Sequence, residues 1–380
     1  MKILIVGVSV RAMVESAVHS SYPVLALDAF GDQDLKLLAE SYSLHHDFNA
    51  RYSPGELYRA SRQLSFDAIA YTSNLENYPD TLRRLAGSGQ IIGNLPETIK
   101  SVRSWEPLFA KLRQAGFSAP DTIFAGEKRK PDPHSRWLIK PALSGGGHRI
   151  AFLRGSELPG GQFFIQEYIP GKPCSASFVA NGHECTVIGI TEQLVGMHEF
   201  GSKGFNYCGN ILPLPESLSH EKGKTILEQV QRLAAFLTKE YCLTGVNGID
   251  FILDGVRVCL TEVNPRYSAS MELIELAYKL PVFHLHTQAV LHGLLPEFKL
   301  EAALMAEQFF GKSIMFAEQN VVAPDTRSWI GRGIRDIPSS NERLHAGNPI
   351  CTVLASRPTY EETLTELISQ AALLKDEIYA

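Results

Sequence analysis

The stretch TEVNPRYSAS, residues 261–270, places an acid, an amide and a guanidinium directly after an apolar run that ends at Leu260. Glu262 and Asn264 are two residues apart, so on a strand their side chains lie on the same face. Oxygen donors on one face suit Mg²⁺, with Mn²⁺ as an alternative, better than softer metals. Arg266 follows, where it could bind a phosphoryl group or a carboxylate. The alternative is a hairpin edge with solvated polar side chains.

A second group of residues suits a phosphate. In WLIKPALSGGGHRI an apolar strand ends at Lys140, and Ser144, Gly145, Gly146 and Gly147 follow as a loop. Glycines let backbone amides approach phosphate oxygens closely, and the lysine supplies positive charge. The loop is not a Walker sequence, because the lysine precedes the glycines. A flexible turn is the alternative.

A third group lies in FFIQEYIPG, where a strand runs into a Pro-Gly turn. If this strand passes beside a base, the carbonyl of Glu167 and the amide of Ile169 are spaced to bind the amino group and a ring nitrogen of adenine. Gln166 and Tyr168 complete the segment. An ordinary strand and turn would have the same sequence.

These groups must be positioned by the elements around them, which alternate in type along the first part of the chain. Residues 1 to about 95 alternate strand and helix patterns, typical of a parallel α/β layer. Ser53, Pro54 and Glu56 predict a capped helix start. GVSVRA after the first strand would place amides and Arg11 at a helix N-terminus, a natural anion site. It lacks the glycines of GxGxxG, which argues against NAD.

From about residue 96 the pattern changes to a helix, a charged loop and short strands with glycine turns. A second domain is expected here. One helix over residues 221–241 is predicted by a single apolar stripe, and a C-terminal helix by the capping-box spacing of Thr359 and Glu362. The residues of the stripe are Ile226, Val230, Leu233 and Leu237.

Composition narrows the class of protein. With 380 residues, 44% hydrophobic and 20% charged, the chain is expected to be globular, with more than one domain. A net charge of −5 without basic runs gives no reason to expect nucleic acid, and no apolar run is long enough for a membrane span. The six cysteines lack CxxC spacing, which indicates free thiols and a cytoplasmic location. His284, His286 and His292 share no helical face and are expected to be structural.

In this order, IKPALSGGG, IQEYI, IDF and EVNPRYSAS resemble the ATP-grasp superfamily of ligases, closest to carbamoyl phosphate synthetase and biotin carboxylase. The resemblance covers most of the chain and implies an α/β fold in three parts. These are an N-terminal parallel α/β domain over residues 1–95, a two-lobed ATP-grasp domain over 96–300 with its small lobe at about 120–195, and a small β-rich cap over 301–380.

The resemblance also implies roles for single residues. Asp250, Glu262 and Asn264 would hold Mg²⁺ beside ATP, while Lys140 and the glycine loop hold the phosphates. A carboxylate would attack the terminal phosphate, Arg266 would stabilise the developing charge, and an amine would capture the acyl phosphate. The expected activity is an ATP-dependent carboxylate-amine ligase that forms ADP and phosphate.

The turn before Glu262 decides whether Asp250 can join it. Residues directly opposed in an antiparallel pair share a face. A two-residue turn at Asp254 and Gly255 would place Asp250 opposite Cys259, on the wrong face. A shared metal site therefore predicts either a loop with an odd number of residues or a β-bulge that restores the parity.

Two positions depart from the family pattern. Trp105 stands where many members have an ATP-contacting lysine or arginine, with Arg103 and Lys100 nearby as replacements. Pro173 stands where many members have a ribose-binding glutamate. These departures keep open a non-catalytic nucleotide-binding protein, and a bicarbonate-using carboxylase-like enzyme is the other alternative; this chain has no biotinyl-lysine segment.

The substrates are less well defined by the sequence. Small-molecule carboxylate and amine partners are expected, and a homodimer is left open. Because similar ligases include an archaeal enzyme that joins tyramine to glutamate, a role in amino-acid or C1-cofactor biosynthesis is the specific hypothesis. Candidate substrate contacts are Arg11, Lys203, Tyr207, Ser268 and Ser270.

Overall fold

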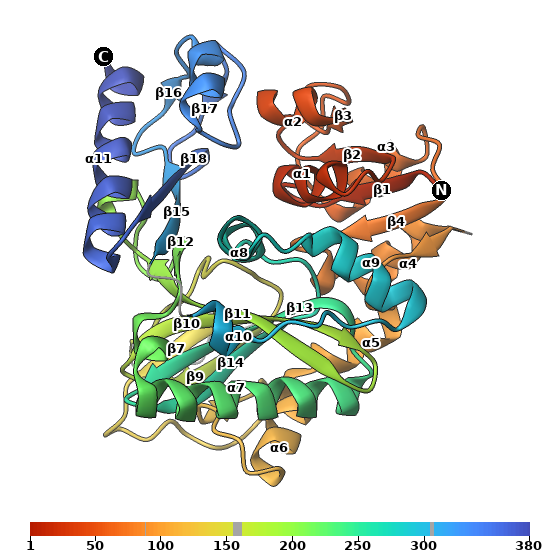
Figure 1. The fold of residues 1–380 in the computed structure, drawn as a ribbon. Helices are drawn as coiled ribbons and strands as arrows, with labels where there is room; N and C mark the ends of the chain where they lie inside the picture. Colours follow the sequence, from red (N-terminus) through yellow and green to blue (C-terminus); the bar gives the residue numbers. More distant parts are fainter. Residues whose placement is uncertain (88, 155–161, 305–307) are drawn as a thin grey trace.

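A computed structural model describes residues 1–380 except 88, 155–161 and 305–307. It begins with a parallel five-stranded sheet in the order β3-β2-β1-β4-β5 (Figure 1). The predicted α/β layer is confirmed. The strands are β1 (Ile3–Val6), β2 (Val24–Asp28), β3 (Glu40–Ser43), β4 (Ala68–Tyr71) and β5 (Gln90–Ile91), with helices α1 (Arg11–His19), α2 (Gln33–Leu38), α3 (Pro54–Ser61) and α4 (Pro79–Ala86) and the 3₁₀ turn η1 (Leu75–Asn77).

A small antiparallel sheet follows, with the order β6-β9-β7-β8. This sheet ends at Glu167, and the next two strands of the chain, which also fall in the predicted small-lobe range of about 120–195, belong to another sheet. The elements are α5 (Pro96–Val102), α6 (Trp105–Gln114), β6 (Thr122–Ile123), β7 (Trp137–Pro141), β8 (Ala151–Phe152) and β9 (Phe163–Glu167).

The largest sheet is antiparallel and has seven strands in the order β14-β13-β10-β11-β12-β15-β18. Its last two strands come from the predicted cap, so part of the C-terminal segment continues the central sheet, while β16 (Val321–Val322) and β17 (Arg343–Leu344) pair in a separate two-stranded sheet. The strands are β10 (Lys172–Asn181), β11 (Cys185–Val195), β12 (Tyr207–Leu212), β13 (Thr244–Asp254), β14 (Arg257–Asn264), β15 (Phe309–Phe316) and β18 (Pro349–Arg357).

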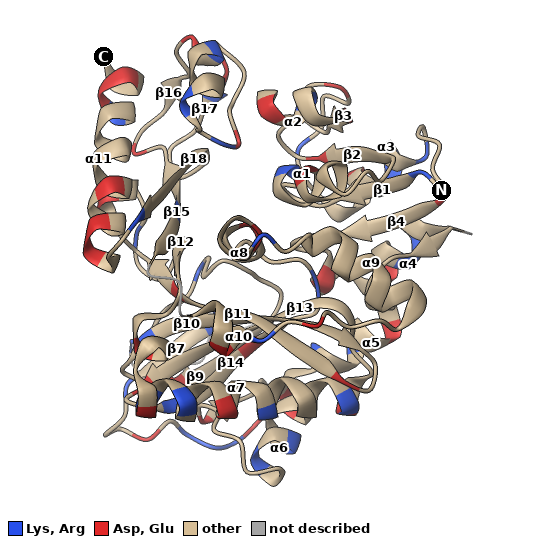
Figure 2. Cartoon of the chain, in the orientation of Figure 1, with Lys and Arg blue, Asp and Glu red and all other residues tan. Residues whose placement is uncertain are grey.

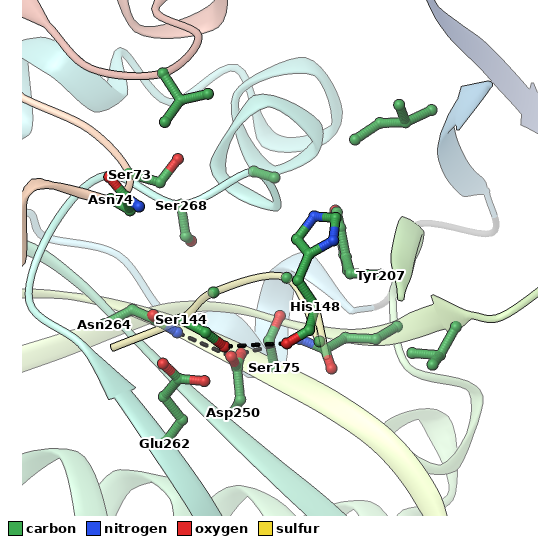
Figure 3. A pocket seen from close by; sticks show the side chains of 18 of the residues that line it. Ser73, Asn74, Ser144, His148, Ser175, Tyr207, Asp250, Glu262, Asn264 and Ser268 are labelled. Carbon is green, nitrogen blue, oxygen red and sulfur yellow. Dashed lines mark hydrogen bonds between the residues drawn. The ribbon is translucent and has the colours of Figure 1, made fainter. Parts of the chain in front are cut away.

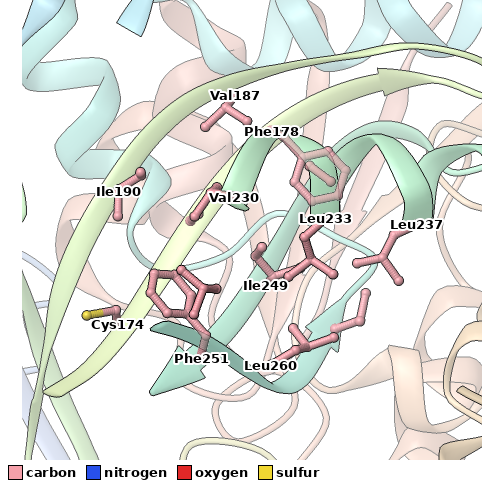
Figure 4. Packing of buried hydrophobic residues seen from close by; sticks show 14 of the residues in the cluster. Cys174, Phe178, Val187, Ile190, Val230, Leu233, Leu237, Ile249, Phe251 and Leu260 are labelled. Carbon is pink, nitrogen blue, oxygen red and sulfur yellow. The ribbon is translucent and has the colours of Figure 1, made fainter. Parts of the chain in front are cut away.

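Helix α7 (His220–Tyr241) packs along one face of this sheet (Figure 1). The predicted stripe is confirmed, because Val230, Leu233 and Leu237 point toward Phe178 and Ile249 of the strands (Figure 4). Its outward face carries charges of both signs (Figure 2). The helix thus fixes one face of β10, β13 and β14 and leaves the other face for the site.

The remaining elements join the sheets. Helix α8 (Met271–Tyr278) follows β14, and its Glu272 contacts both the N-terminal and the C-terminal segments. The predicted caps at Ser53 and Thr359 are confirmed, since each side chain accepts a backbone N–H. The other elements are α9 (Val282–His292), α10 (Leu300–Ala303), α11 (Tyr360–Tyr379), β16 (Val321–Val322), β17 (Arg343–Leu344), η2 (His198–Phe200), η3 (Pro215–Leu218) and η4 (Thr326–Arg332). No described helix is long and apolar enough to cross a membrane.

Candidate active site

One cavity of about 880 Å³ lies between the N-terminal parallel sheet, the small antiparallel sheet and the central sheet, and Figure 3 shows part of its lining. It collects side chains from all parts of the chain, including Asn74 of the N-terminal domain and Lys312 of β15. Of the residues singled out in the sequence, only Lys203 lines a separate, smaller hollow. Those in the main cavity are Arg11, Lys140, Ser144, Gly145, Gly146, Gly147, Gln166, Glu167, Tyr168, Ile169, Tyr207, Asp250, Glu262, Asn264, Arg266, Ser268 and Ser270.

Asp250 and Glu262 lie directly opposite one another on β13 and β14. Near the turn Asp254 pairs with Arg257, so a regular ladder would place Asp250 opposite Thr261 and turn Glu262 to the other face. A register shift after Phe251 prevents this, because Thr261 is an extra residue in β14. The bulge required by the parity is therefore present.

The oxygen donors of this site form a compact group with Asn264 (Figure 3). Asn264 Nδ2 donates to Asp250 Oδ2 at 2.9 Å, and Gln193 Nε2 donates to Asp250 Oδ1 at 2.9 Å. Burial and the nearby charge of Glu262 raise the pKa of Asp250 to about 7. Two facing carboxylates with an amide oxygen are hard donors, and a divalent cation between them would relieve their repulsion. The donor set fits Mg²⁺.

This donor set contains only two carboxylates. Among the residues that the structure describes, no group of three or more His, Cys, Asp or Glu side chains could hold a metal ion. The amide of Asn264 lies beside the two carboxylates, with its Nδ2 on Asp250 and its Oδ1 accepting from Arg266. Such a site leaves ligand positions for the phosphate oxygens and waters that Mg²⁺ usually keeps.

Lys140 is in β7 of the small antiparallel sheet and lines the same cavity as the oxygen donors of the central sheet. Its Nζ donates to Gln166 Oε1 at 3.0 Å. Burial lowers the pKa of Lys140, and the charges of Glu262 and Asp250 act in the opposite direction. Lys140 thus lies close enough to the acidic group for its charge to be felt there, which is the arrangement expected for a lysine that binds phosphate.

The glycine loop is closed against the loop that leads into β12. The amide of Tyr207 donates to the carbonyl of Gly146 at 3.0 Å. A side chain at Gly147 would meet the carbonyl oxygen of Phe205 at 1.8 Å, and its φ of +74° also favours glycine. Gly145 has open space around it and no such constraint. Only part of the glycine run is therefore required by packing.

The segment after β9 presents its backbone to the cavity beside Leu138 and Ile252. The amide of Glu167 donates to Asp121 O at 2.8 Å, and the amide of Tyr168 donates to Arg136 O at 2.8 Å. The amide of Ile169 donates to no residue in the described part of the chain. A free amide beside an apolar surface is what adenine recognition by this segment requires.

Arg103, which the sequence placed only near the site, does not line the cavity but pairs with Glu262, which does. Its Nη1 lies 2.6 Å from Glu262 Oε1, and its guanidinium lies 4.4 Å from the ring centre of Trp105. Trp105 itself donates its indole N–H to Ala142 O at 3.2 Å, behind the glycine loop. Lys100 is exposed and does not line the cavity. Of the two possible replacements for the basic residue that Trp105 displaces, Arg103 is therefore the one near the site.

Arg266 is held by Glu76, which sequence reasoning missed. Its Nη2 lies 2.8 Å from Glu76 Oε1 and donates to Asn264 Oδ1 at 3.2 Å. Burial acts to lower the pKa of Arg266, but the charge and hydrogen bond of Glu76 and the charges of Glu262 and Asp250 together outweigh it, so the pKa is raised. Glu76 is 1% exposed in η1, just beyond β4. A polar residue at the carboxyl end of a parallel strand was the available signal.

The candidate substrate residues have different surroundings. Arg11 is buried and its guanidinium is already shared by four carboxylates, so it is not free to bind an anionic substrate as the sequence suggested. Tyr207 O–H donates to Asn210, and Ser268 and Ser270 contact one another at 3.1 Å between hydroxyl oxygens. The carboxylate partners of Arg11 are Glu15, Asp34, Glu272 and Asp336.

Comparison with known proteins adds an independent line of support. Residues 106–270 match the model of the ATP-grasp domain. An uncharacterized protein of Methanocaldococcus jannaschii is 24% identical over 377 residues, which cover 93% of this chain and 88% of the relative. Neither finding depends on the geometry described above.

Solved structures share the fold at low identity. The L-amino acid ligase of Bacillus licheniformis has a TM-score of 0.67 and 16% identity, with 100% of this chain and 98% of that chain covered. The biotin carboxylase domain of Hydrogenobacter thermophilus 2-oxoglutarate carboxylase, solved with MgADP and bicarbonate, has a TM-score of 0.72, 14% identity and coverages of 96% and 88%.

Rhizobium etli pyruvate carboxylase, with a TM-score of 0.73 and 15% identity, covers 97% of this chain, which spans only 37% of that protein. The matched range 106–270 contains the proposed donors Asp250, Glu262 and Asn264 as well as Lys140 and the glycine loop. The fold is shared with these solved structures over 96 to 100% of this chain. Residues 106–270 are an ATP-grasp domain, and the chain as a whole has the fold of the ATP-grasp superfamily.

Proposed function

We propose that this protein is an ATP-dependent carboxylate-amine ligase that forms an acyl phosphate and releases ADP and phosphate. The observation that carries the proposal is the pairing of Asp250 with Glu262 across a bulged hairpin, in the same cavity as Lys140 and Arg266. A regular ladder would place these carboxylates on opposite faces of the hairpin, and the bulge brings them to the same face, as a shared role requires. Two carboxylates, a lysine and an arginine in one cavity are suited to bind the terminal phosphate of ATP together with its metal ion.

In this proposal the segment after β9 binds adenine through its backbone, and the glycine loop with Lys140 holds the phosphates. Asp250, Glu262 and Asn264 would hold Mg²⁺, which supplies charge neutralisation on the phosphate oxygens when bound. Arg103, placed against Glu262, is a further cation on this side of the cavity.

The first chemical step joins a carboxylate oxygen to the terminal phosphorus, and the bond from that phosphorus to the ADP oxygen breaks. Arg266, held by Glu76, stabilises the charge on the transferring group. In the second step the amine nitrogen attacks the acyl carbon, the bond to phosphate oxygen breaks, and the nitrogen loses a proton. The products are an amide, ADP and phosphate.

The carboxylate substrate class is proposed from two lines of support. The fold neighbour from Bacillus licheniformis is an L-amino acid ligase, which makes amino acids the first acids to test. The biotin carboxylase neighbour was solved with bicarbonate, so bicarbonate is the second candidate and defines the carboxylating alternative. Both would use the same phosphate chemistry and differ in the group that is activated.

The proposal is tested by a screen of amino acids, other small carboxylic acids and bicarbonate, each with and without an amine, with ADP release as the readout. Hydroxylamine should trap the activated acid as a hydroxamate. Asp250→Asn should abolish the activity, whereas Asp254→Asn, at the exposed end of the same strand, should retain it. AMP in place of ADP would contradict the acyl-phosphate mechanism, and ADP formed only with bicarbonate would favour the carboxylating alternative.

A further inference from the structure

The cavity has a second charged region, away from the oxygen donors, where the N-terminal domain meets the C-terminal segment. Asp32 and Asp336 line it, and Asp28 and Asp34 lie close by. Figure 2 shows acidic colour on α2 at the side of the N-terminal domain nearest the C-terminal segment. We refer to Asp28, Asp32, Asp34 and Asp336 as the acidic end of the cavity.

Most carboxylates of the acidic end have protein partners. Asp34 accepts the amides of Asp336 and Ile337 at 2.9 and 3.0 Å. Asp336 accepts Arg11 Nε at 3.0 Å. Asp28 accepts two amides through Oδ1, those of Phe30 and Gly31. Asp34 therefore stabilises the contact between α2 and the segment 336–338, and Asp28 stabilises the turn after β2, although its Oδ2 is buried without a partner.

Asp32 is different, because its carboxylate accepts no hydrogen bond from any described residue. It occupies the N-cap position of α2, where an aspartate side chain normally accepts an amide of the first turn, yet this one makes no such bond. The side chain is 6% exposed, and its Oδ2 is buried without a partner. Asp32 is among the residues that line the cavity, so a ligand there would lie beside this residue.

The nearby cations do not supply the missing partner. Arg11 is used by Glu15, Glu272 and Asp336, and Lys312 Nζ donates to Glu272 and to the carbonyl of Ala269. Burial raises the pKa of Asp32, and the charges of Asp28, Asp336 and Asp34 raise it further, more than Arg11 lowers it. A buried carboxylate without a partner is unfavourable, and a cationic ligand would remove the penalty.

The acidic end is connected to the phosphate end by a short piece of chain. Arg266 contacts Asn264, and Glu272, six positions further on, contacts both Arg11 and Lys312. Six residues span at most about 20 Å even when fully extended. One cavity therefore presents a site for a phosphorylated carboxylate and, in another part of its lining, a site of opposite charge preference.

We propose that the acidic end binds an organic cation of the substrate, a primary ammonium or guanidinium group, with Asp32 as its main contact. The inference rests on the proposed ligase function, since it names the chemical class that the second part of that site accepts. The cation belongs either to the amine substrate or to an amino acid that is activated elsewhere in the cavity. Both sources offer the same N–H donors to the carboxylate.

The test measures the melting temperature Tm of the full chain with methylammonium chloride, at constant ionic strength, against tetramethylammonium chloride, which has no N–H donor. Methylammonium should raise the Tm by about 1 °C or more beyond tetramethylammonium. Asp32→Asn and Asp32→Ser should both abolish the difference, and Asp80→Asn, which removes an exposed carboxylate of the same domain, should retain it. Two variants at Asp32 guard against a folding defect in either one.

An equal Tm in the two salts, or a difference that persists in both Asp32 variants, would overturn the inference. Binding of Mg²⁺ and ATP is measured on the same samples, so that the two proposals can fail separately. Loss of the methylammonium effect with ATP binding intact rejects only the cation site. A methylammonium effect that Asp32 controls supports the cation site even if the screen for ADP release rejects the ligase. Finally, 1,5-diaminopentane and L-lysine distinguish a plain amine from an amino acid, with L-norleucine as the control that lacks the side-chain ammonium. The compound that raises the Tm more than L-norleucine does, and loses this extra rise in Asp32→Asn, identifies the source of the cation. If neither compound raises the Tm more than L-norleucine, the inference is contradicted.

Discussion

The carboxylate of Glu76 lies 2.8 Å from the guanidinium of Arg266, and the two come from different domains. Glu76 is in η1 of the N-terminal domain, whereas Arg266 follows β14 of the central sheet. Asn264 Oδ1 also accepts from Arg266, so the same guanidinium joins the N-terminal domain to the proposed metal ligands. The position of Arg266 therefore depends on how the N-terminal domain docks.

Glu76→Gln tests this dependence. The variant keeps the shape of the side chain but removes its charge, so Arg266 loses its buried counterion. Turnover should fall by roughly tenfold or more, because a displaced catalytic group loses most of its effect, while the affinity for ATP should change little. Glu97→Gln, at an exposed carboxylate that pairs with Arg83, is the matched control. Turnover equal to that of the control would show that Glu76 does not position Arg266.

Lys140→Ala and Arg266→Ala should differ in what they change. Lys140 is proposed to touch ATP in the ground state, so its loss should weaken nucleotide binding, measured by calorimetry. Arg266 is proposed to act on the transferring group, so its loss should lower kcat by roughly tenfold to a thousandfold with ATP affinity nearly unchanged. If both variants lose only ATP affinity, Arg266 has no catalytic role.

Gly147→Ala and Gly145→Ala form a second matched pair. The first adds a methyl group that collides with the carbonyl of Phe205 at a backbone φ of +74°, whereas the second adds one in open space. Gly147→Ala should displace the glycine loop and weaken ATP binding by roughly tenfold or more, and Gly145→Ala should bind ATP nearly as the wild type does. Equal affinities for the two variants would mean that the closed loop is not the ATP-binding conformation.

His286 should make stability depend on pH. Its ring accepts the Val246 amide at Nδ1 and contacts Ile92 O through Nε2, and burial lowers its pKa from 6.5 to about 4. Between these two values the unfolded chain binds a proton that the folded protein does not, so stability is lost as the pH falls from about 6.5 to about 4. The contribution is on the order of 3 kcal/mol.

Urea unfolding at several pH values checks this prediction. In His286→Gln the free energy of unfolding should vary less between pH 4 and 6.5 than in the wild type, whatever its value at pH 8. His134→Gln, at an exposed histidine, should keep the wild-type dependence. If the stability of His286→Gln depends on pH as that of the wild type does, other titratable groups cause the pH dependence.

Features fixed by neighbouring residues could be predicted from the sequence. The cap at Ser53, the stripe of α7 and the need for a bulge near Asp250 each follow from spacing along a short segment. The strand β3 has the polar sequence ESYS and forms an edge of its sheet, so no apolar pattern marks it as a strand. Patterns that repeat every two to four residues predict local secondary structure and which side chains share a face, but not the partners of an element in the fold.

Pairings between distant segments could not be predicted in this way. Glu76 and Arg103 pair with residues of the site only because the N-terminal domain and α5 dock on β14, and nothing in their local sequence specifies that partner. The same holds for Arg11, which the sequence placed at an anion site. The structure instead surrounds it with carboxylates from four elements or loops, including Asp336 from the C-terminal segment. Such partners depend on tertiary contacts, which the spacing of apolar residues along the sequence does not predict.

The continuation of the central sheet into β15 and β18 has a consequence for the solubility of the chain. Without these strands β12 would be an edge, and its unpaired amides and carbonyls next to the apolar side chains of Ile211 and Leu212 would be open to pairing with another molecule. β15 covers that edge, and β18, backed by α11, covers β15 in turn. The C-terminal segment therefore moves the edge of the central sheet from β12 to β18, and a chain truncated before Phe309 is expected to aggregate even if its nucleotide site is intact.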